Sequence, residues 1–258
     1  MTTPDAPAAA PVAFAFHQPD LLIDLYQPVR HGDWELRLGG MVLTQGYWSP
    51  PQLVPKMVAL LRGDDMWMSI TPLEVESQAI GIAQASGHVV IFGLGLGWAA
   101  AASALRPQVT AVTVVERDPD VLALHDTLNL FSKLPGGVGD KVRIVPGDAL
   151  SWWPDRPVDV LMPDIWLMLV SDGRVDEVRR MQANVAAERV YFWGQEIEIA
   201  RHARAAGRPL DAAGIAATLA DFDLPLIGPE VPGYPALVAQ VAERWMHGRW
   251  LPDAGIAT

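Results

Sequence analysis

Three glycines at alternate positions follow a short run of apolar residues. Residues 89–92 are all apolar, Gly93, Gly95 and Gly97 come next, and an alanine-rich segment begins at Trp98. This order predicts a buried strand, a tight turn and the first turn of a helix. Glycine lets the backbone bend sharply and approach a ligand closely, because no Cβ stands in the way. The feature therefore favours an α/β fold that holds a ligand at this turn.

The overall composition limits the kinds of partner. The chain has 258 residues, of which 50% are hydrophobic, which fits one large α/β domain with extensions or two small domains. Its net charge is −11 without a Lys/Arg cluster, so we expect no nucleic-acid partner and a small-molecule substrate that is neutral or cationic. The absence of cysteine excludes disulfides, thiolate nucleophiles and cysteine metal sites.

The sequence carries no targeting signal that we recognise. Residues 1–15 are predicted to be a disordered tail, since the first eleven are rich in Ala and Pro and lack Lys and Arg. Residues 89–105 are apolar, but three glycines interrupt them, which favours the strand, turn and helix of a soluble sheet over a membrane span. We therefore expect a cytoplasmic protein without a membrane partner.

Strand and helix signals alternate from residue 71 to residue 193. Thr71 as N-cap, Pro72 at the first helical position and Glu74 predict a helix that ends near residue 85. Alternation of this kind gives right-handed crossovers and a mostly parallel, Rossmann-like sheet with helices on both faces. The remaining predicted strands are 110–116, 142–145, 158–162 and 189–193, and helices are predicted at 98–105, 118–128 and 172–187.

The flanking segments carry different signals. Residues 34–44 alternate apolar and polar around Gly39 and Gly40, which predicts a small N-terminal β-hairpin, and residues 54–61 are compatible with a short helix. After Gly194 only helical patterns remain. We therefore divide the chain into the tail at 1–15, an N-terminal extension with a β-hairpin at 16–68, a Rossmann-like domain at 69–200 and a helical C-terminal segment at 201–258.

The residues after the glycines narrow the class of ligand. A triphosphate-binding loop needs Gly-Lys-Ser/Thr, whereas Trp98 and Ala99 follow Gly97 here. A dinucleotide loop places its third glycine three residues after the second, and that position is again Trp98. These residues argue strongly against a nucleoside triphosphate and also disfavour NAD.

Carboxylates follow three of the predicted strands. Glu116 ends the second strand, Asp148 follows the third and Asp164 follows the fourth. Glu116 can accept two hydrogen bonds from a ribose diol, and Asp148 can accept one from an exocyclic amine. Each acid also has an ordinary alternative role as a strand end, a turn residue or a helix cap.

These segments resemble, in order, four motifs of the class I S-adenosylmethionine-dependent methyltransferases. They are 93–97 (Gly-x-Gly-x-Gly), 115–119 (Val-Glu-Arg-Asp-Pro), 146–149 (Pro-Gly-Asp-Ala) and 159–164. The resemblance implies that the second acid binds the ribose hydroxyls, that the third-strand acid contacts the adenine amine and that the fourth motif borders the active site. It implies S-adenosylmethionine as cofactor, bound by Gly93, Gly95, Gly97, Glu116, Arg117, Asp148, Ala149 and Asp164.

One branch of that superfamily, the spermidine synthases, resembles the chain in two further respects. It has an apolar residue where this chain has Ile91, and it carries an N-terminal β-hairpin. That branch binds its polyamine with Asp-x-x-Asp, whereas Leu167 stands where the second Asp would follow Asp164. The usual C-terminal β-hairpin is either very short, near residues 224–227, or missing. Members of the branch are often dimers, which leaves a homodimer open here.

We therefore expect a methyltransferase that acts on a small molecule, with Asp164 orienting or deprotonating the acceptor. Trp166 and Trp193 follow strands and are candidate aromatic walls for the substrate, with core packing as the alternative. Tyr47 and Trp48 are candidates for a lid over the substrate. The scattered histidines indicate no metal site. The other functions left open are aminopropyl transfer and a non-catalytic protein that binds S-adenosylmethionine or a partner subunit.

Overall fold

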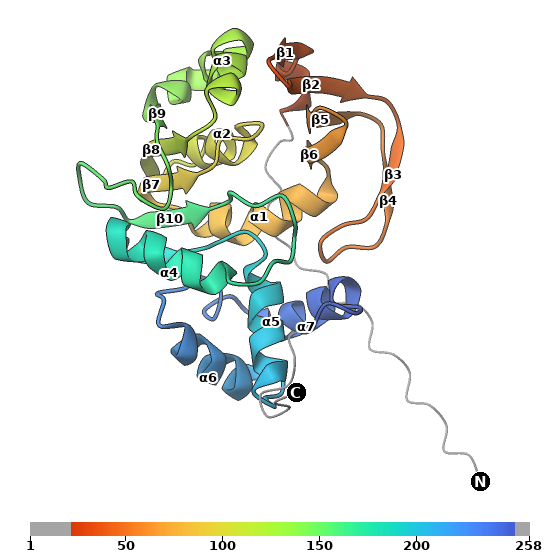
Figure 1. Ribbon diagram of the computed structural model, residues 1–258, viewed down its shortest axis with the longest axis vertical. Coiled ribbons are helices and arrows are strands. Elements are labelled where there is room, and N and C mark those ends of the chain that lie inside the picture. Colours follow the sequence, from red (N-terminus) through yellow and green to blue (C-terminus); the bar gives the residue numbers. More distant parts are fainter. Residues whose placement is uncertain (1–21, 251–258) are drawn as a thin grey trace.

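The computed structural model describes residues 22–250, so the predicted tail at 1–15 lies outside the described residues. A five-stranded parallel sheet forms the centre of the molecule, and a four-stranded antiparallel sheet stands beside it (Figure 1). A separate two-stranded ribbon extends from the antiparallel sheet. The predicted Rossmann-like α/β architecture is confirmed.

The parallel sheet brings the ends of its strands to one edge. Its order is β11-β10-β7-β8-β9, and every neighbouring pair is parallel. The register pairs Phe92 with both Val115 and Pro163, and Glu116 with Pro146. The loops that follow these strands are therefore neighbours in space. The strands are β7 (Gly87–Phe92), β8 (Val109–Glu116), β9 (Val142–Pro146), β10 (Val160–Pro163) and β11 (Arg189–Val190).

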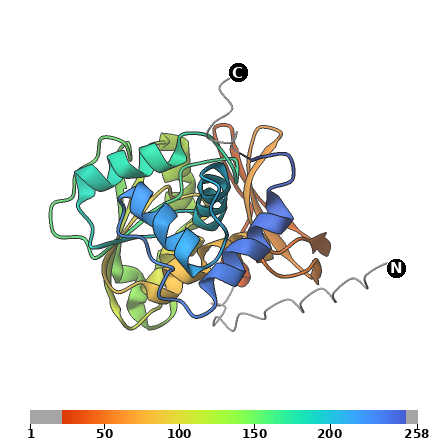
Figure 2. The same ribbon diagram turned by 90° about the horizontal axis from the view of Figure 1, so that it is seen from below.

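Helices cover both faces of this sheet because its strands are apolar on both sides. In β7, Val89 and Ile91 pack into one core with residues of the first three helices, while Val90 and Phe92 pack into a second core with α4. Figure 2 shows α1 and α4 on opposite sides of the sheet. The helices are α1 (Pro72–Gln84), α2 (Trp98–Ala104), α3 (Pro119–Leu128), α4 (Arg174–Val185) and α5 (Gln195–Ala205).

The C-terminal segment is helical, as predicted. Helices α6 (Ala212–Phe222) and α7 (Tyr234–Trp245) both pack against α5. Among the described residues, the segment at 224–227, considered above for a very short hairpin, instead makes one parallel bridge, between Leu226 and Val190. The backbone N–H of Ile227 donates to the carbonyl of Val190 at 2.8 Å, so this short segment covers the β11 edge of the sheet.

The predicted hairpin at residues 34–44 is wrong. Strand β2 (Trp34–Gly39) pairs with β1 (Val29–His31) and β5 (Met57–Arg62), and β3 (Val42–Thr44) pairs only with β4 (Gln52–Val54). Residues 39–40 mark the point where the chain leaves the sheet.

The actual hairpin turns of the antiparallel sheet lie elsewhere. They are the two-residue turns that begin at Gly32 and Gly63, whose φ values are +55° and +59°. A positive φ at the first turn position is what two-residue hairpins require.

The short helix considered for residues 54–61 is also wrong, because most of that segment belongs to β5. This strand lies between β2 and β6 (Asp65–Ile70), and Val58 and Leu60 are fully buried. A short, continuous apolar run has no period that distinguishes a buried strand from a buried helix.

Candidate functional site

A cavity lies between the carboxyl ends of the parallel strands and the N-terminal antiparallel sheet. Open α/β sheets bind their ligands at this edge. The strand-end loops contribute the predicted residues Gly93, Gly95, Glu116, Arg117, Asp148, Ala149, Asp164 and Trp166. The antiparallel sheet contributes residues that the sequence did not indicate, namely Trp34, Leu60, Arg62, Trp67 and Met68.

The glycine loop needs glycine for both its conformation and its packing. Gly93, Gly95 and Gly97 have φ values of +95°, +48° and +73°, which side chains with a Cβ rarely adopt. A Cβ at Gly93 would overlap the carbonyl oxygen of Asp164, and one at Gly95 would overlap the sulfur of Met68. The first two glycines line the cavity, whereas Gly97 precedes α2 and is not among the lining residues.

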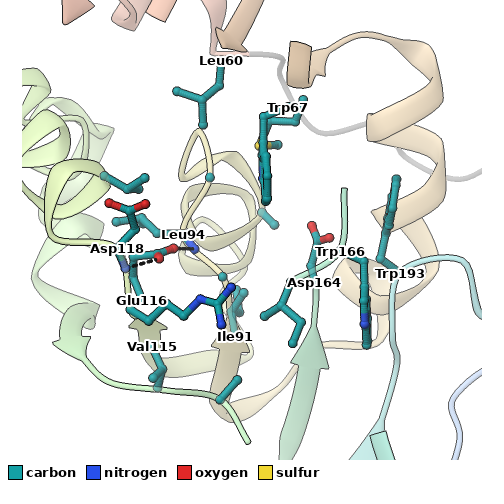
Figure 3. A pocket seen from close by; sticks show the side chains of 18 of the residues that line it. Leu60, Trp67, Ile91, Leu94, Val115, Glu116, Asp118, Asp164, Trp166 and Trp193 are labelled. Carbon is teal, nitrogen blue, oxygen red and sulfur yellow. Dashed lines mark hydrogen bonds between the residues drawn. The ribbon is translucent and has the colours of Figure 1, made fainter. Parts of the chain in front are cut away.

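Glu116 fixes two backbone segments at the edge of the cavity. Its Oε2 accepts a hydrogen bond of 2.9 Å from the backbone N–H of Leu94, and its Oε1 accepts one of 2.8 Å from that of Asp118 (Figure 3). The side chain is partly exposed and lines the cavity, as does Arg117 beside it. Since a carboxylate oxygen accepts more than one hydrogen bond, Glu116 retains capacity for hydroxyl groups of a ligand.

Asp148 and Ala149 lie in the loop after β9. The Oδ1 atom of Asp148 accepts from the backbone N–H of Leu150 at 2.9 Å, which is the turn role considered from the sequence. The same residue is exposed and lines the cavity together with Ala149. The turn thus places a carboxylate where it can accept from a ligand.

Asp164 directly follows β10, and its backbone N–H donates to the carbonyl of Phe92 at 2.8 Å. Its Oδ2 accepts a hydrogen bond of 2.8 Å from the side-chain amide of Gln78 in α1. Burial raises the pKa of Asp164 to about 7, against the opposing effects of the Arg174 charge and the Gln78 hydrogen bond. A carboxyl with a pKa near neutrality can exchange a proton with a substrate at physiological pH.

Glu74 is a lining residue that the sequence did not assign to the site. It lies in the first turn of α1 and is 7% exposed. Burial first, and then the charge of Asp164, raise the pKa of Glu74 well above its usual range. The sequence feature that could have identified Glu74 is its spacing from Gln78: the two polar residues lie one turn apart in a helix that is otherwise mostly apolar.

Three tryptophans gather around Asp164. Trp166 and Trp193 were predicted, and Trp67 comes from β6 of the antiparallel sheet (Figure 3). Hydrogen bonds fix two of the indoles, since Nε1 of Trp166 donates to Glu177 at 2.5 Å and Nε1 of Trp193 donates to Ser77 at 2.9 Å. These rings present apolar faces at fixed positions in the cavity.

Tyr47 and Trp48, predicted as substrate contacts, do not line this cavity. Both side chains are buried between the N-terminal segment and the helices. The hydroxyl of Tyr47 donates to Oε2 of Glu196 at 3.1 Å, and the backbone N–H of Trp48 donates to Glu76 at 2.8 Å. These contacts attach the segment before β4 to α1 and α5.

The described part of the chain contains no group of three His, Asp or Glu side chains placed to hold a metal ion. Within residues 22–250, no helix has both the length and the apolar character needed to cross a membrane.

Comparison with known proteins gives partial structural similarities only. No family model and no curated protein matches the chain. Among solved structures, a DhpI–SAH complex is 22% identical, with 39% of this chain and 44% of that chain covered and a TM-score of 0.29. The mitomycin 7-O-methyltransferase MmcR is 23% identical, with coverages of 44% and 33% and a TM-score of 0.33.

A third structure is CalS10, an amino pentose methyltransferase from Micromonospora echinaspora with bound SAM. It is 22% identical, with 44% of this chain and 47% of that chain covered and a TM-score of 0.30. The chain thus spans less than half the length of each of these three structures.

Proposed function

We propose that the protein is an S-adenosylmethionine-dependent methyltransferase that acts on a small molecule. One observation carries this proposal: the glycine loop and the acids after β8, β9 and β10 line a single cavity. Glu116, Asp148 and Asp164 are thereby arranged along the strand ends in the order that a nucleoside with a reactive tail requires.

The residues present suit this cofactor. Glu116 would accept from the ribose hydroxyls, and Asp148 would accept from the adenine amine. The lining acids are Glu74, Glu116, Asp118, Asp148 and Asp164, whereas the lining guanidinium groups are Arg62 and Arg117. An excess of carboxylates favours a ligand that carries positive charge, as a sulfonium does, over a phosphorylated nucleotide.

The protein contributes mainly position and proton transfer. When bound, the cofactor supplies a methyl group already activated on a sulfonium. The N-terminal sheet covers the strand ends and limits access of water, and the backbone at Gly93 and Gly95 allows close approach of the ligand. Asp164, with its pKa near 7, accepts a proton from the acceptor group.

Calorimetric titration with S-adenosylmethionine tests the proposal directly. We expect a single binding site in the wild-type protein and methyl transfer from radiolabelled cofactor to a member of a small-molecule panel. Failure to bind at millimolar cofactor would reject the proposal. Binding without transfer to any acceptor would favour the non-catalytic alternative, and product formation only from decarboxylated cofactor with putrescine would favour aminopropyl transfer.

A further inference from the structure

Two carboxyl groups from different elements line the same cavity, and the charge of Asp164 acts on Glu74. Glu74 comes from α1 and Asp164 from the loop after β10, and both line the cavity. The amide of Gln78, one turn after Glu74 in α1, donates to Asp164 at 2.8 Å, so the two acids face the same part of the cavity. Two acids that share a buried site repel each other when both are ionised, so the pair is stabilised by a cation placed between them.

The nearest buried guanidinium group is engaged elsewhere. Nη1 of Arg174 donates to the carbonyl of Trp193 at 3.0 Å and to that of Leu169 at 2.8 Å. Its Nη2 donates to the carbonyl of Met168 at 2.5 Å and to Ser171. The charge of Arg174 acts on Asp164 at a distance, but its hydrogen bonds are directed to residues 168–171 and to Trp193, which lies three residues after β11. When both acids are ionised, a ligand cation is the group that would pair with them directly.

The other cations that line the cavity belong to its nucleoside end. Arg117 follows Glu116 in sequence, and the guanidinium of Arg62 lies 5.4 Å from the ring centroid of Trp34, whose Nε1 donates to Asp118. Figure 3 shows Glu116 and Asp118 on one side of the cavity and Trp166 and Trp193 on the other, with Asp164 between them. The cavity thus has a mixed-charge end and an acidic, aromatic end.

Indole rings complete the acidic end. The side chains of Trp67, Trp166 and Trp193 lie around Asp164 (Figure 3). Indole faces attract cations, and more so where water is excluded. Carboxylates that accept N–H hydrogen bonds, together with indole walls, form an environment that prefers an alkylammonium group to a neutral hydroxyl.

We propose that Glu74 and Asp164 together bind one ammonium group, and that the methyl acceptor is a primary or secondary amine. The inference rests on the proposed methyltransferase function and adds the substrate class. It differs from the polyamine motif considered above, because the second acid comes from α1, while the exposed Leu167 provides no carboxylate. The site therefore holds a single cationic nitrogen.

Methyl transfer to this nitrogen requires only the ammonium group, the two carboxyl groups and the cofactor's sulfonium. The ammonium nitrogen gives one proton to the carboxylate of Asp164 and becomes a neutral nucleophile. The new C–N bond forms as the C–S bond of the sulfonium breaks, and the electron pair of that bond stays on sulfur. Glu74 remains next to the nitrogen and stabilises the positive charge of the N-methylammonium product.

Equilibrium binding tests the site independently of turnover. The protein saturated with S-adenosylhomocysteine is titrated with primary amines of increasing size, each paired with the alcohol in which OH replaces NH2. We expect at least one amine to bind about tenfold or more tightly than its alcohol, a difference of about 1.4 kcal/mol. Glu74→Gln should remove most of that preference and leave cofactor affinity within about twofold.

A matched control lies on the same helix. Glu76→Gln changes another buried glutamate of α1, which accepts from Trp48 and Ser49 and does not line the cavity. It should keep the amine preference. Thermal melts of both variants establish that each remains folded at the assay temperature.

The other outcomes are distinguishable. Equal binding of every amine and its alcohol, or an amine preference that survives Glu74→Gln, would overturn the inference. A Glu74→Gln variant that loses affinity for S-adenosylmethionine but keeps the amine preference would assign the ammonium to the cofactor's own amino acid end. Methyl transfer to alcohols or phenols but not to amines would also overturn it. Wild-type protein that fails to bind S-adenosylmethionine would reject the proposed function instead.

Discussion

The side-chain amide of Gln78 donates a hydrogen bond of 2.8 Å to Oδ2 of Asp164. This contact joins the middle of α1 to the loop after β10. The hydrogen bond stabilises the ionised carboxylate and so lowers the pKa of Asp164, against the larger effect of burial, which raises it to about 7. Gln78 therefore contributes to the protonation state of the residue to which we assign proton transfer, together with burial and the charge of Arg174.

Replacing Gln78 by Met removes the hydrogen bond while keeping a side chain of similar length. We expect the pKa of Asp164 to rise, and the lower limb of the pH–rate profile to move to higher pH by about half a unit to one unit. The control is Gln84→Met, since Gln84 ends the same helix and does not line the cavity. An unshifted profile in Gln78→Met would show that Asp164 is not the titrating group.

The stability of the protein should fall as pH rises from about 4 to about 7. Burial raises the pKa of Asp164 and of Glu196 to about 7, from reference values of 3.8 and 4.5. Each folded-state pKa thus lies above its unfolded value, so the folded state binds more protons between about pH 4 and pH 7. The stability that this protonation provides is complete below about pH 4, is lost as pH rises to about 7, and changes little above that.

Urea unfolding between about pH 5 and pH 8 measures this slope. Asp164→Asn and Glu196→Gln should each flatten it, because each removes a group that takes up a proton on folding. In the wild type, Glu196 accepts from the hydroxyls of Tyr47, Tyr191 and Tyr234. Glutamine has the same size as glutamate and keeps an oxygen that can accept from these hydroxyls, so Glu196→Gln removes the titration with little change in packing. A slope that is unchanged in both variants would contradict the assignment.

The strands and helices that build the parallel sheet were predictable along the chain because their signals are local. Apolar runs, the glycines at 93–97 and the Asp118–Pro119 helix start each lie within a few residues. The N-terminal sheet was not predictable in the same way. Several glycines compete as turns there, and only the pairing of β2 with both β1 and β5 selects Gly32 and Gly63 over residues 39–40.

The two halves of the cavity differ in how far the sequence predicts them, and the reason is again whether the signals are local. Glu116, Asp148 and Asp164 follow strands of one sheet, so chain order alone places them at one edge. Trp67 and Met68 reach the cavity only because the antiparallel sheet packs against α3 and the glycine loop, which no local pattern encodes. Tyr47 and Trp48 were assigned by proximity in sequence to a predicted hairpin, and the actual strand pairing places them elsewhere.

Glu116 should be the residue on which cofactor binding depends most. Glu116→Ala removes the acceptor for the backbone N–H groups of Leu94 and Asp118 and the proposed acceptor for the ribose hydroxyls. We expect cofactor affinity to fall by about ten- to a hundredfold, which corresponds to about 1.4 to 2.8 kcal/mol. Calorimetry measures this, with Asp126→Asn on the exposed face of α3 as the control. Equal affinities in the two variants would remove Glu116 from the cofactor site.

Arg174 should govern the aromatic end of the cavity without contacting the ligand. Its guanidinium is fully buried, lies 4.5 Å from the ring centroid of Trp166, and donates to the carbonyls of Trp193 and Leu169. Arg174→Lys keeps the charge but loses the planar fork that makes these contacts together. Each carbonyl left without a donor costs about 1–3 kcal/mol, so we expect a lower Tm.

The kinetic effect of Arg174→Lys should be selective. The loop that carries Trp166 and the segment between β11 and α5 that carries Trp193 would lose a common anchor. We therefore expect KM for the acceptor to rise and tryptophan fluorescence to change. Cofactor affinity should change little, since Glu116 and Asp148 lie in other loops. Steady-state kinetics with each substrate varied in turn measures the difference. A rise in KM for the cofactor alone would contradict the role that we assign to Arg174.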